Sequence, residues 1–139
     1  MHGREFLGTA RRLVPNSNEA DWHAAAGRAY YALLHEARVA LQRWGFSLPP
    51  KDQVHAFVRL RFVYAQDRDL KVIGYALEEL VKLRNQADYR IEKSGPFAHA
   101  VPVQQAIHSA QDCIDTLDLN ETDVTRRTAA IAAIRAAFP

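Results

Sequence analysis

Two oppositely charged residues, Arg84 and Asp88, stand one helical turn apart at the end of an apolar stripe. The stripe recurs at steps of three and four residues, as one face of a helix requires, and consists of Leu70, Ile73, Leu77, Leu80 and Val81. Asn85 and Tyr89 continue the same helical pattern beside the charged pair. An unpaired buried charge costs several kcal/mol, so Arg84 must reach water or meet hydrogen-bonding partners.

A second polar set occupies the middle of the long helical pattern that precedes this one. Arg28 and His35 share one helical row, and Tyr31 stands beside it, on a helix whose wide apolar face predicts burial. Arginine holds phosphate oxygens in a bidentate manner, and histidine titrates near neutrality and can move a proton. The two sets together are typical of a phosphate site. They predict Arg84 and His35 as catalytic residues, and Arg28, Tyr31, Asn85, Asp88 and Tyr89 as ligand-binding residues.

Three interpretations of these residues stay open. Cleavage of RNA needs no metal when a base takes the 2′-hydroxyl proton and an arginine stabilises the charged phosphorane, with Arg84 on the phosphate and His35 as the base. Alternatively, Asp88 neutralises Arg84, and the polar residues form a network that only fixes the register of the helices. In the third interpretation the protein is a non-catalytic interaction module, and its acidic residues Asp112, Asp115 and Asp118 dock a basic partner.

Helical signals predict the elements that position these residues, and strand signals are almost absent. The predicted helices cover residues 4–14, 19–44 and 53–65, then a stretch from Asp67 or Asp69 to Lys93, residues 97–119, and a last helix after Asn120. Asn18 is the predicted N-cap of the second helix, Gly45 follows its end, and Asn120 is the predicted N-cap of the last helix. Long helices joined by modest loops pack antiparallel. Residues 1–139 are therefore predicted to form one all-α domain, an up-down bundle of four to six helices.

The composition excludes several classes of protein. With 139 residues, of which 48% are hydrophobic and 24% charged, the chain has the balance of one globular domain. Its single cysteine excludes an internal disulfide and any multi-cysteine zinc site, and indicates a reducing compartment. The six histidines are scattered, and no cofactor motif is present, so we expect neither a metal nor a cofactor. No run approaches the roughly 18 apolar residues of a membrane helix, and we expect a cytoplasmic protein.

Two motifs carry a resemblance to a known family. Residues 28–41 read RAYYALLHEARVAL, and residues 83–89 read LRNQADY. In this order and separation they resemble small prokaryotic members of the HEPN superfamily (higher eukaryotes and prokaryotes nucleotide-binding). VHAF at residues 54–57 also stands where those relatives often place a histidine that opens a short third helix. The resemblance covers roughly residues 4–117 and implies a HEPN-like domain.

The resemblance implies an all-α bundle, commonly a homodimer, that binds nucleotide or RNA. It also implies frequent pairing with a minimal nucleotidyltransferase in toxin–antitoxin-like operons. Many members are metal-independent endoribonucleases, with an arginine followed four to six residues later by a histidine. Arg84 and Asn85 match the start of that motif, but Tyr89 stands where the shortest spacing would place the histidine. Because a phenol with a pKa of about 10 is a poor base at neutral pH, the resemblance favours binding of nucleotide or RNA with a transferase partner, and marks Tyr89 as a candidate for nucleotidylation.

Overall fold

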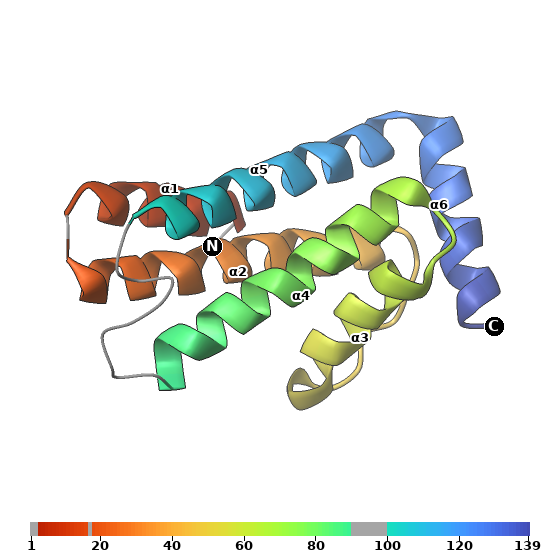
Figure 1. Cartoon of the computed structure of the whole chain (residues 1–139). Helices are drawn as coiled ribbons and strands as arrows, with labels where there is room; N and C mark the ends of the chain where they lie inside the picture. Colours follow the sequence, from red (N-terminus) through yellow and green to blue (C-terminus); the bar gives the residue numbers. More distant parts are fainter. Residues whose placement is uncertain (1–2, 17, 90–99) are drawn as a thin grey trace.

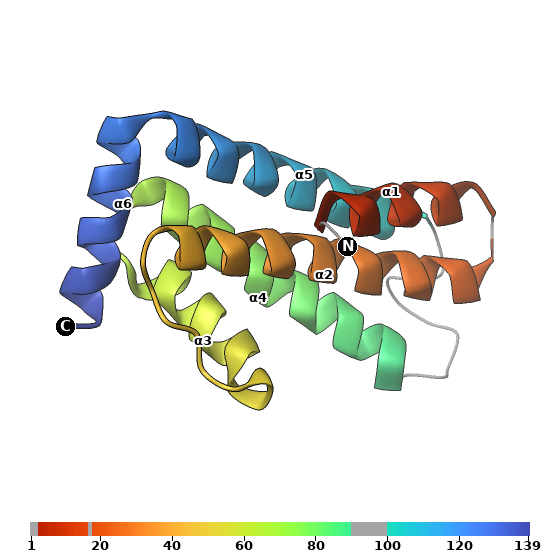
Figure 2. The same ribbon diagram turned by 180° about the vertical axis from the view of Figure 1, so that it is seen from behind.

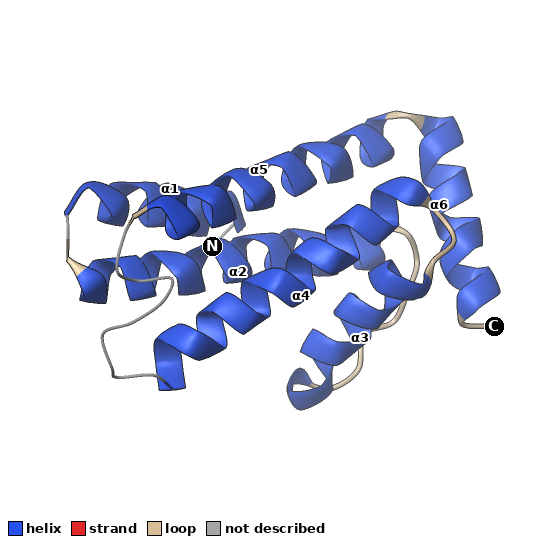
Figure 3. Ribbon diagram, in the orientation of Figure 1, coloured by secondary structure: helices blue, strands red, loops and turns tan. Residues whose placement is uncertain are grey.

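The computed structural model describes residues 3–16, 18–89 and 100–139 and, within them, all side chains except those of residues 87–89. These residues form six α-helices and one turn of 3₁₀ helix, with no strand among them (Figures 1 and 3). The elements are α1 (Gly3–Leu13), η1 (Val14–Asn16), α2 (Glu19–Arg43), α3 (Lys51–Tyr64), α4 (Arg68–Tyr89), α5 (Val101–Thr122) and α6 (Val124–Ala137). The prediction of an all-α helical bundle is confirmed. The predicted helix end at Lys93 and helix start at residue 97 lie outside the described residues.

Helix α2 is the central element of the bundle, and it packs against α1, α4 and α5. It runs antiparallel to α1 and α4, and α5 runs antiparallel to α4, so the long helices alternate in direction (Figures 1 and 2). Its buried side chains are mostly small and include Ala25, Ala26, Ala29, Ala32, Ala37 and Ala40. Because short side chains let neighbouring backbones approach closely, an alanine-rich helix can hold neighbours on several sides.

The apolar side chains gather on the inner faces of the helices. The largest fully buried ones include Leu7, Leu33, Leu41, Phe62, Leu70, Ile73, Leu77, Ile114 and Ile134. Helix α3 packs against α4, and α6 crosses one end of the bundle, where it contacts α5 and α3 (Figure 1). None of the helices in the described ranges combines the length and the apolarity that crossing a bilayer requires.

Several predicted helix ends are confirmed where a polar side chain or a glycine sets them. The side chain of Asn18 accepts a hydrogen bond from the backbone N–H of Asp21 at 2.9 Å and caps α2. Gly45 follows that helix with a φ of +93°, a left-handed conformation that favours glycine. The side chain of Asp67 accepts from the N–H of Leu70 at 3.1 Å at the start of α4.

The prediction that Asn120 begins the last helix is wrong. Helix α5 continues to Thr122, and Asp123 caps α6 by accepting a hydrogen bond from the N–H of Arg126 at 3.1 Å. Asn120 is only 1% exposed, and its amide donates to the carbonyl oxygen of Thr116 at 2.9 Å. An amide that is satisfied inside its own helix does not initiate the next one, whereas the exposed carboxylate of Asp123 suits the positive end of the α6 dipole.

Gly74 sets the separation of α3 and α4. A Cβ atom at this position would lie 2.5 Å from the backbone nitrogen of Val63 and 2.8 Å from the carbonyl carbon of Phe62. Both neighbours are backbone atoms, so neither can move without shifting α3 as a whole. The absence of a side chain at Gly74 therefore fixes how closely α3, which carries His55, lies against α4, which carries Arg84.

We expect Gly74→Ala to lower the free energy of unfolding by about 1–3 kcal/mol, because the added methyl group pushes the two helices apart. Gly27→Ala in α2 is the matched control, since a Cβ there meets nothing within 4 Å. That variant should instead gain up to about 1 kcal/mol from the better helix propensity of alanine. Urea unfolding followed by circular dichroism measures both. A gain of stability in both variants would contradict the close crossing.

Candidate functional site

Arg84 lies at the margin of the core, where its guanidinium faces two tyrosine rings. The Cζ atom lies 5.4 Å from the ring centroid of Tyr30 and 5.4 Å from that of Tyr31. Tyr30 is only 2% exposed, whereas its neighbour Tyr31 is 37% exposed, so the arginine spans the boundary between core and solvent. A ring face attracts a cation without neutralising its formal charge. The bundle therefore holds a half-buried positive charge beside an exposed aromatic ring.

His55 joins this group from α3. The hydroxyl oxygen of Tyr30 lies 2.8 Å from Nδ1 of His55, within hydrogen-bond distance. The ring of His55 also lies edge-on to Tyr31, with 6.2 Å between the ring centroids. We call Arg84, Tyr30, Tyr31 and His55 the arginine–tyrosine cluster. Its members come from three helices, so it forms only when α2, α3 and α4 are packed together.

Burial keeps both titratable partners of this hydrogen bond neutral, and the neighbouring arginines favour the neutral form of His55 but not that of Tyr30. Burial raises the pKa of Tyr30, although the positive charges of Arg84 and Arg59 oppose the rise. Burial also lowers the pKa of His55 below its ordinary value of 6.5, and here Arg84 and Arg59 lower it further. At neutral pH the cluster therefore contains a phenol, a neutral imidazole and the cation of Arg84.

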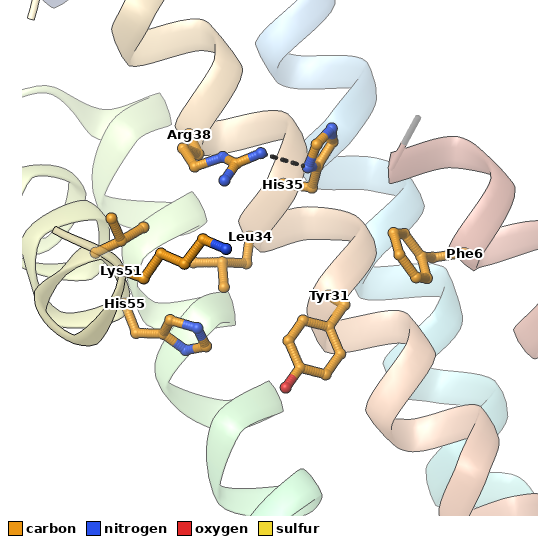
Figure 4. A pocket seen from close by; sticks show the side chains of 8 residues that line it. Phe6, Tyr31, Leu34, His35, Arg38, Lys51 and His55 are labelled. Atoms are coloured by element: carbon orange, nitrogen blue, oxygen red, sulfur yellow. Dashed lines mark hydrogen bonds between the residues drawn. The ribbon is translucent and has the colours of Figure 1, made fainter. Parts of the chain in front are cut away.

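A pocket of about 260 Å³ opens beside the cluster, between α1, α2 and α3 (Figure 4). Its described lining residues are Phe6, Tyr31, Leu34, His35, Arg38, Lys51, Val54 and His55. We call it the α1–α2–α3 pocket. Tyr31 and His55 belong both to this pocket and to the cluster, so the two features share a wall. The described lining contains two cations, Arg38 and Lys51, and no carboxylate.

His35 lies in the pocket and is tied to Arg38. A terminal guanidinium nitrogen of Arg38 lies 3.0 Å from Nδ1 of His35. Because arginine can only donate, Nδ1 of His35 accepts this hydrogen bond, and a neutral His35 then carries its hydrogen on Nε2. In that tautomer Nε2 donates a hydrogen bond and does not accept a proton. The general-base role predicted for His35 would require this arrangement to change.

The structure brings some of the predicted site residues together and separates others. Arg84 and Tyr31 are in contact, as the phosphate-site hypothesis requires. Arg28 is exposed, and its guanidinium lies 5.8 Å from the ring centroid of Phe6, on a shallower pocket that also includes Tyr31. Asn85 is exposed on α4. The predicted roles of Asp88 and Tyr89 concern side chains that lie outside the described residues.

The polar row of α2, predicted to run along the middle of a buried helix, is only partly buried. Ala32 in this row is fully buried, but Arg28 is exposed and His35 is half-buried. The row therefore follows the edge of the apolar face, where long polar side chains reach water while their apolar parts stay covered.

Four polar residues of the site were not singled out for it by the sequence analysis: Tyr30, Arg38, Lys51 and His55. Tyr30 falls among the apolar positions of its helix, so the sequence predicted a core residue there. Arg38 follows His35 at a spacing of three, and this helical spacing could have identified it. Lys51 was missed because α3 begins two residues earlier than predicted, directly after Pro50. For His55, the VHAF resemblance was the available signal.

The acidic residues of α5 are partly engaged within the chain. Asp118 pairs with Arg4 of α1 at 2.6 Å. Asp115 accepts a hydrogen bond from Gln111 at 2.9 Å, and Gln111 in turn accepts one from Arg11 at 2.7 Å. Part of this acidic face therefore holds α1 against α5, which leaves less of its charge for an external basic partner.

Comparison with known proteins adds no relative. No family model, no curated protein and no solved structure matches this chain. Among the described residues, no three His, Cys, Asp or Glu side chains gather in a way that could hold a metal ion. The class of protein that the fold defines is thus an all-α helical bundle, and the function has to be inferred from the cluster and the pocket.

We expect removal of the Arg84 charge to raise the pKa of His55, because Arg84 is the largest cause of its depression after burial. In an NMR pH titration of His55, the Arg84→Met variant should show a higher midpoint than the unmodified protein. Arg68→Met, an exposed position at the opposite end of α4, is the control and should leave the midpoint unchanged. An unchanged or lower midpoint in Arg84→Met would show that the guanidinium does not act on this imidazole.

Proposed function

We propose that this protein is a HEPN-like domain that binds the phosphate groups of a nucleotide or RNA through Arg84. The observation that carries the proposal is the half-buried guanidinium held against the rings of Tyr30 and Tyr31. Arginine is the side chain best suited to phosphate, and the exposed ring of Tyr31 offers a base a stacking surface worth about 1–3 kcal/mol. A cation beside an aromatic platform is the combination that binds single-stranded nucleic acid.

The charges around the cluster support the same ligand. Arg59 acts on Tyr30 and His55 with the same sign as Arg84, and Arg38 and Lys51 line the adjoining pocket. His55 is neutral, so it adds a hydrogen-bonding ring without adding to the repulsion among the cations. A polyanion approaching this side of the bundle therefore meets several positive charges from α2, α3 and α4.

The resemblance of residues 28–41 and 83–89 extends the proposal to partners and location. We include in it a minimal nucleotidyltransferase as partner, a homodimer, and a cytoplasmic, toxin–antitoxin-like setting, with Tyr89 as the residue that the transferase modifies. These parts rest on the motifs alone. A small nucleotidyltransferase gene beside the gene for this chain supports them, and a neighbourhood without one removes them.

Arg84→Met should weaken binding of a single-stranded RNA oligonucleotide by about tenfold or more, because a charge-assisted hydrogen bond contributes about 1.5–3 kcal/mol. The slope of log K against log salt should also fall in magnitude by about 0.7 for each phosphate that the variant no longer neutralises. Fluorescence anisotropy at several salt concentrations measures both quantities.

Arg68→Met serves as the control for this experiment, because it removes an exposed arginine from the same helix far from the cluster. It should leave the affinity within about twofold, since one distant surface charge contributes little at physiological salt. Equal affinities of Arg84→Met and the unmodified protein for RNA and nucleotides would refute the proposed site.

Metal-independent cleavage of RNA is the second candidate function, and the hydrogen bond between His55 and Tyr30 is the observation that favours it. If Nδ1 of His55 donates to the hydroxyl oxygen of Tyr30, then Nε2 carries a lone pair and can take a 2′-hydroxyl proton near Arg84. His35, the base suggested by the sequence, is less suited because its Nδ1 accepts from Arg38.

This candidate predicts cleavage of RNA in the presence of EDTA. Activity should fall at least about 100-fold in His55→Gln, the usual size of a general-base contribution. His35→Gln should retain most of the activity, because Nδ1 of His35 accepts a hydrogen bond from Arg38 and the ring is therefore not the base. Intact RNA after incubation of the unmodified protein with varied single-stranded substrates excludes the ribonuclease and leaves the binding function in place.

A further inference from the structure

The α1–α2–α3 pocket has the charge of an anion site of its own. Arg38 from α2 and Lys51 from α3 reach into the same space (Figure 4). No carboxylate appears among the described lining residues, and the nearest residue in sequence that could oppose Lys51, Asp52, is exposed and not part of the lining. The two formal positive charges of this pocket are therefore not balanced within it.

The start of α3 adds to this positive potential. Lys51 is the first residue of this 14-residue helix, and Val54 and His55 of its first turns also line the pocket. The N-cap residue is Pro50, whose side chain makes no capping hydrogen bond. The N-cap side chain thus offers no acceptor to the first backbone N–H groups of α3, of which that of Gln53 donates to the carbonyl oxygen of Pro50 at 2.9 Å. A helix N-terminus of this kind attracts anions.

Arg38 provides an independent indication that an acceptor is missing. One terminal nitrogen of its guanidinium donates to His35, but its buried Nε has no hydrogen-bond partner among the described residues. Buried donors are almost always satisfied, and an exception calls for an explanation. If the guanidinium turned toward an anion in the pocket, its donors would be paired. In the structure, the hydrogen bond to Nδ1 of His35 holds the guanidinium at the pocket wall.

We propose that the α1–α2–α3 pocket binds the terminal phosphate of a nucleotide, held by Lys51, Arg38 and the start of α3. A terminal phosphate carries about −1.5 to −2 charges near pH 7, whereas a phosphate within a chain carries one. Two cations and a helix N-terminus match the terminal group. The volume of about 260 Å³ lies just below the usual range for small-molecule pockets, which suits a single nucleotide end.

The apolar side of the pocket suits the nucleoside attached to that phosphate. The rings of Phe6 and Tyr31 lie 6.3 Å apart between centroids and line the pocket with Leu34 and Val54. Tyr31 also contacts Arg84, with 5.4 Å between Cζ and the ring centroid. A nucleotide whose terminal phosphate lies in the pocket therefore lies beside the ring that also contacts Arg84. In naming a nucleotide as the ligand this inference rests on the proposed function, whereas the phosphate site itself does not need Arg84.

The experiment compares oligonucleotides of one sequence that end in a hydroxyl, a 5′-phosphate or a 3′-phosphate, together with a free nucleoside monophosphate. Fluorescence anisotropy, with the unlabelled nucleotide as competitor, should show about tenfold tighter binding of one phosphorylated end than of the hydroxyl end. Lys51→Gln should abolish this difference. Lys51 is exposed, so the substitution is compatible with folding even if Arg38→Gln, which removes a partly buried side chain, is not.

Two further variants separate this inference from the proposed function. Arg84→Met should weaken the binding of all the oligonucleotides while keeping the preference for a phosphorylated end. Lys82 is an exposed residue of α4 that pairs with Glu79 at 3.2 Å. The control substitution Lys82→Gln should change neither the overall affinity nor the preference for a phosphorylated end. RNA binding without preference for a terminal phosphate, or a preference that survives Lys51→Gln, overturns the pocket assignment and leaves the Arg84 site standing.

Failure of RNA binding altogether would refute the RNA part of the proposed function without deciding the phosphate site. In that case inorganic phosphate and the nucleoside monophosphate are titrated into ¹⁵N-labelled protein. Shifts of the amide signals of Lys51 and Val54 that disappear in Lys51→Gln support the site. The absence of such shifts at millimolar ligand overturns it.

Discussion

The close packing of three helices around α2 is the constraint on which the rest of the structure depends. Its alanine-rich inner face lets α1, α4 and α5 approach the same helix, and this leaves its neighbouring tyrosines at the edge of the core. Successive residues of a helix point about 100° apart. Tyr30 therefore turns inward and Tyr31 outward, and the side chain between the two environments is Arg84. The position of the site follows from the packing of the bundle.

The site places a positive charge where an apolar core ends, and aromatic rings make this position tolerable. Two ring faces attract the guanidinium, while the adjoining imidazole stays neutral under the combined effect of burial and the neighbouring arginines. The result is a cation that two ring faces help to position. A surface arginine on a flexible side chain would lose more conformational entropy on binding an anion, so a preorganised one binds it more strongly.

The sequence predicted the parts of this arrangement that lie within single helices. The stripe that ends at Arg84, the Asn18 cap and the glycine at position 45 all follow from local spacing, and each is found. The partner imidazole was not predicted, because which histidine meets Arg84 depends on how α3 lies against α4 at Gly74, a contact between distant segments. The prediction that Asn120 caps the last helix was wrong for a similar reason. The burial of Asn120 depends on how the helices pack in the bundle, which the local sequence does not show.

Tyr31 contacts Arg84 and also lines the α1–α2–α3 pocket. A ligand that turns or fixes this ring at one of these places therefore alters the surface offered at the other. Thermodynamic linkage makes such an influence reciprocal, so that each ligand changes the affinity of the other by the same factor. A shared ring is thus a route by which the two places can be coupled with no movement of the helices.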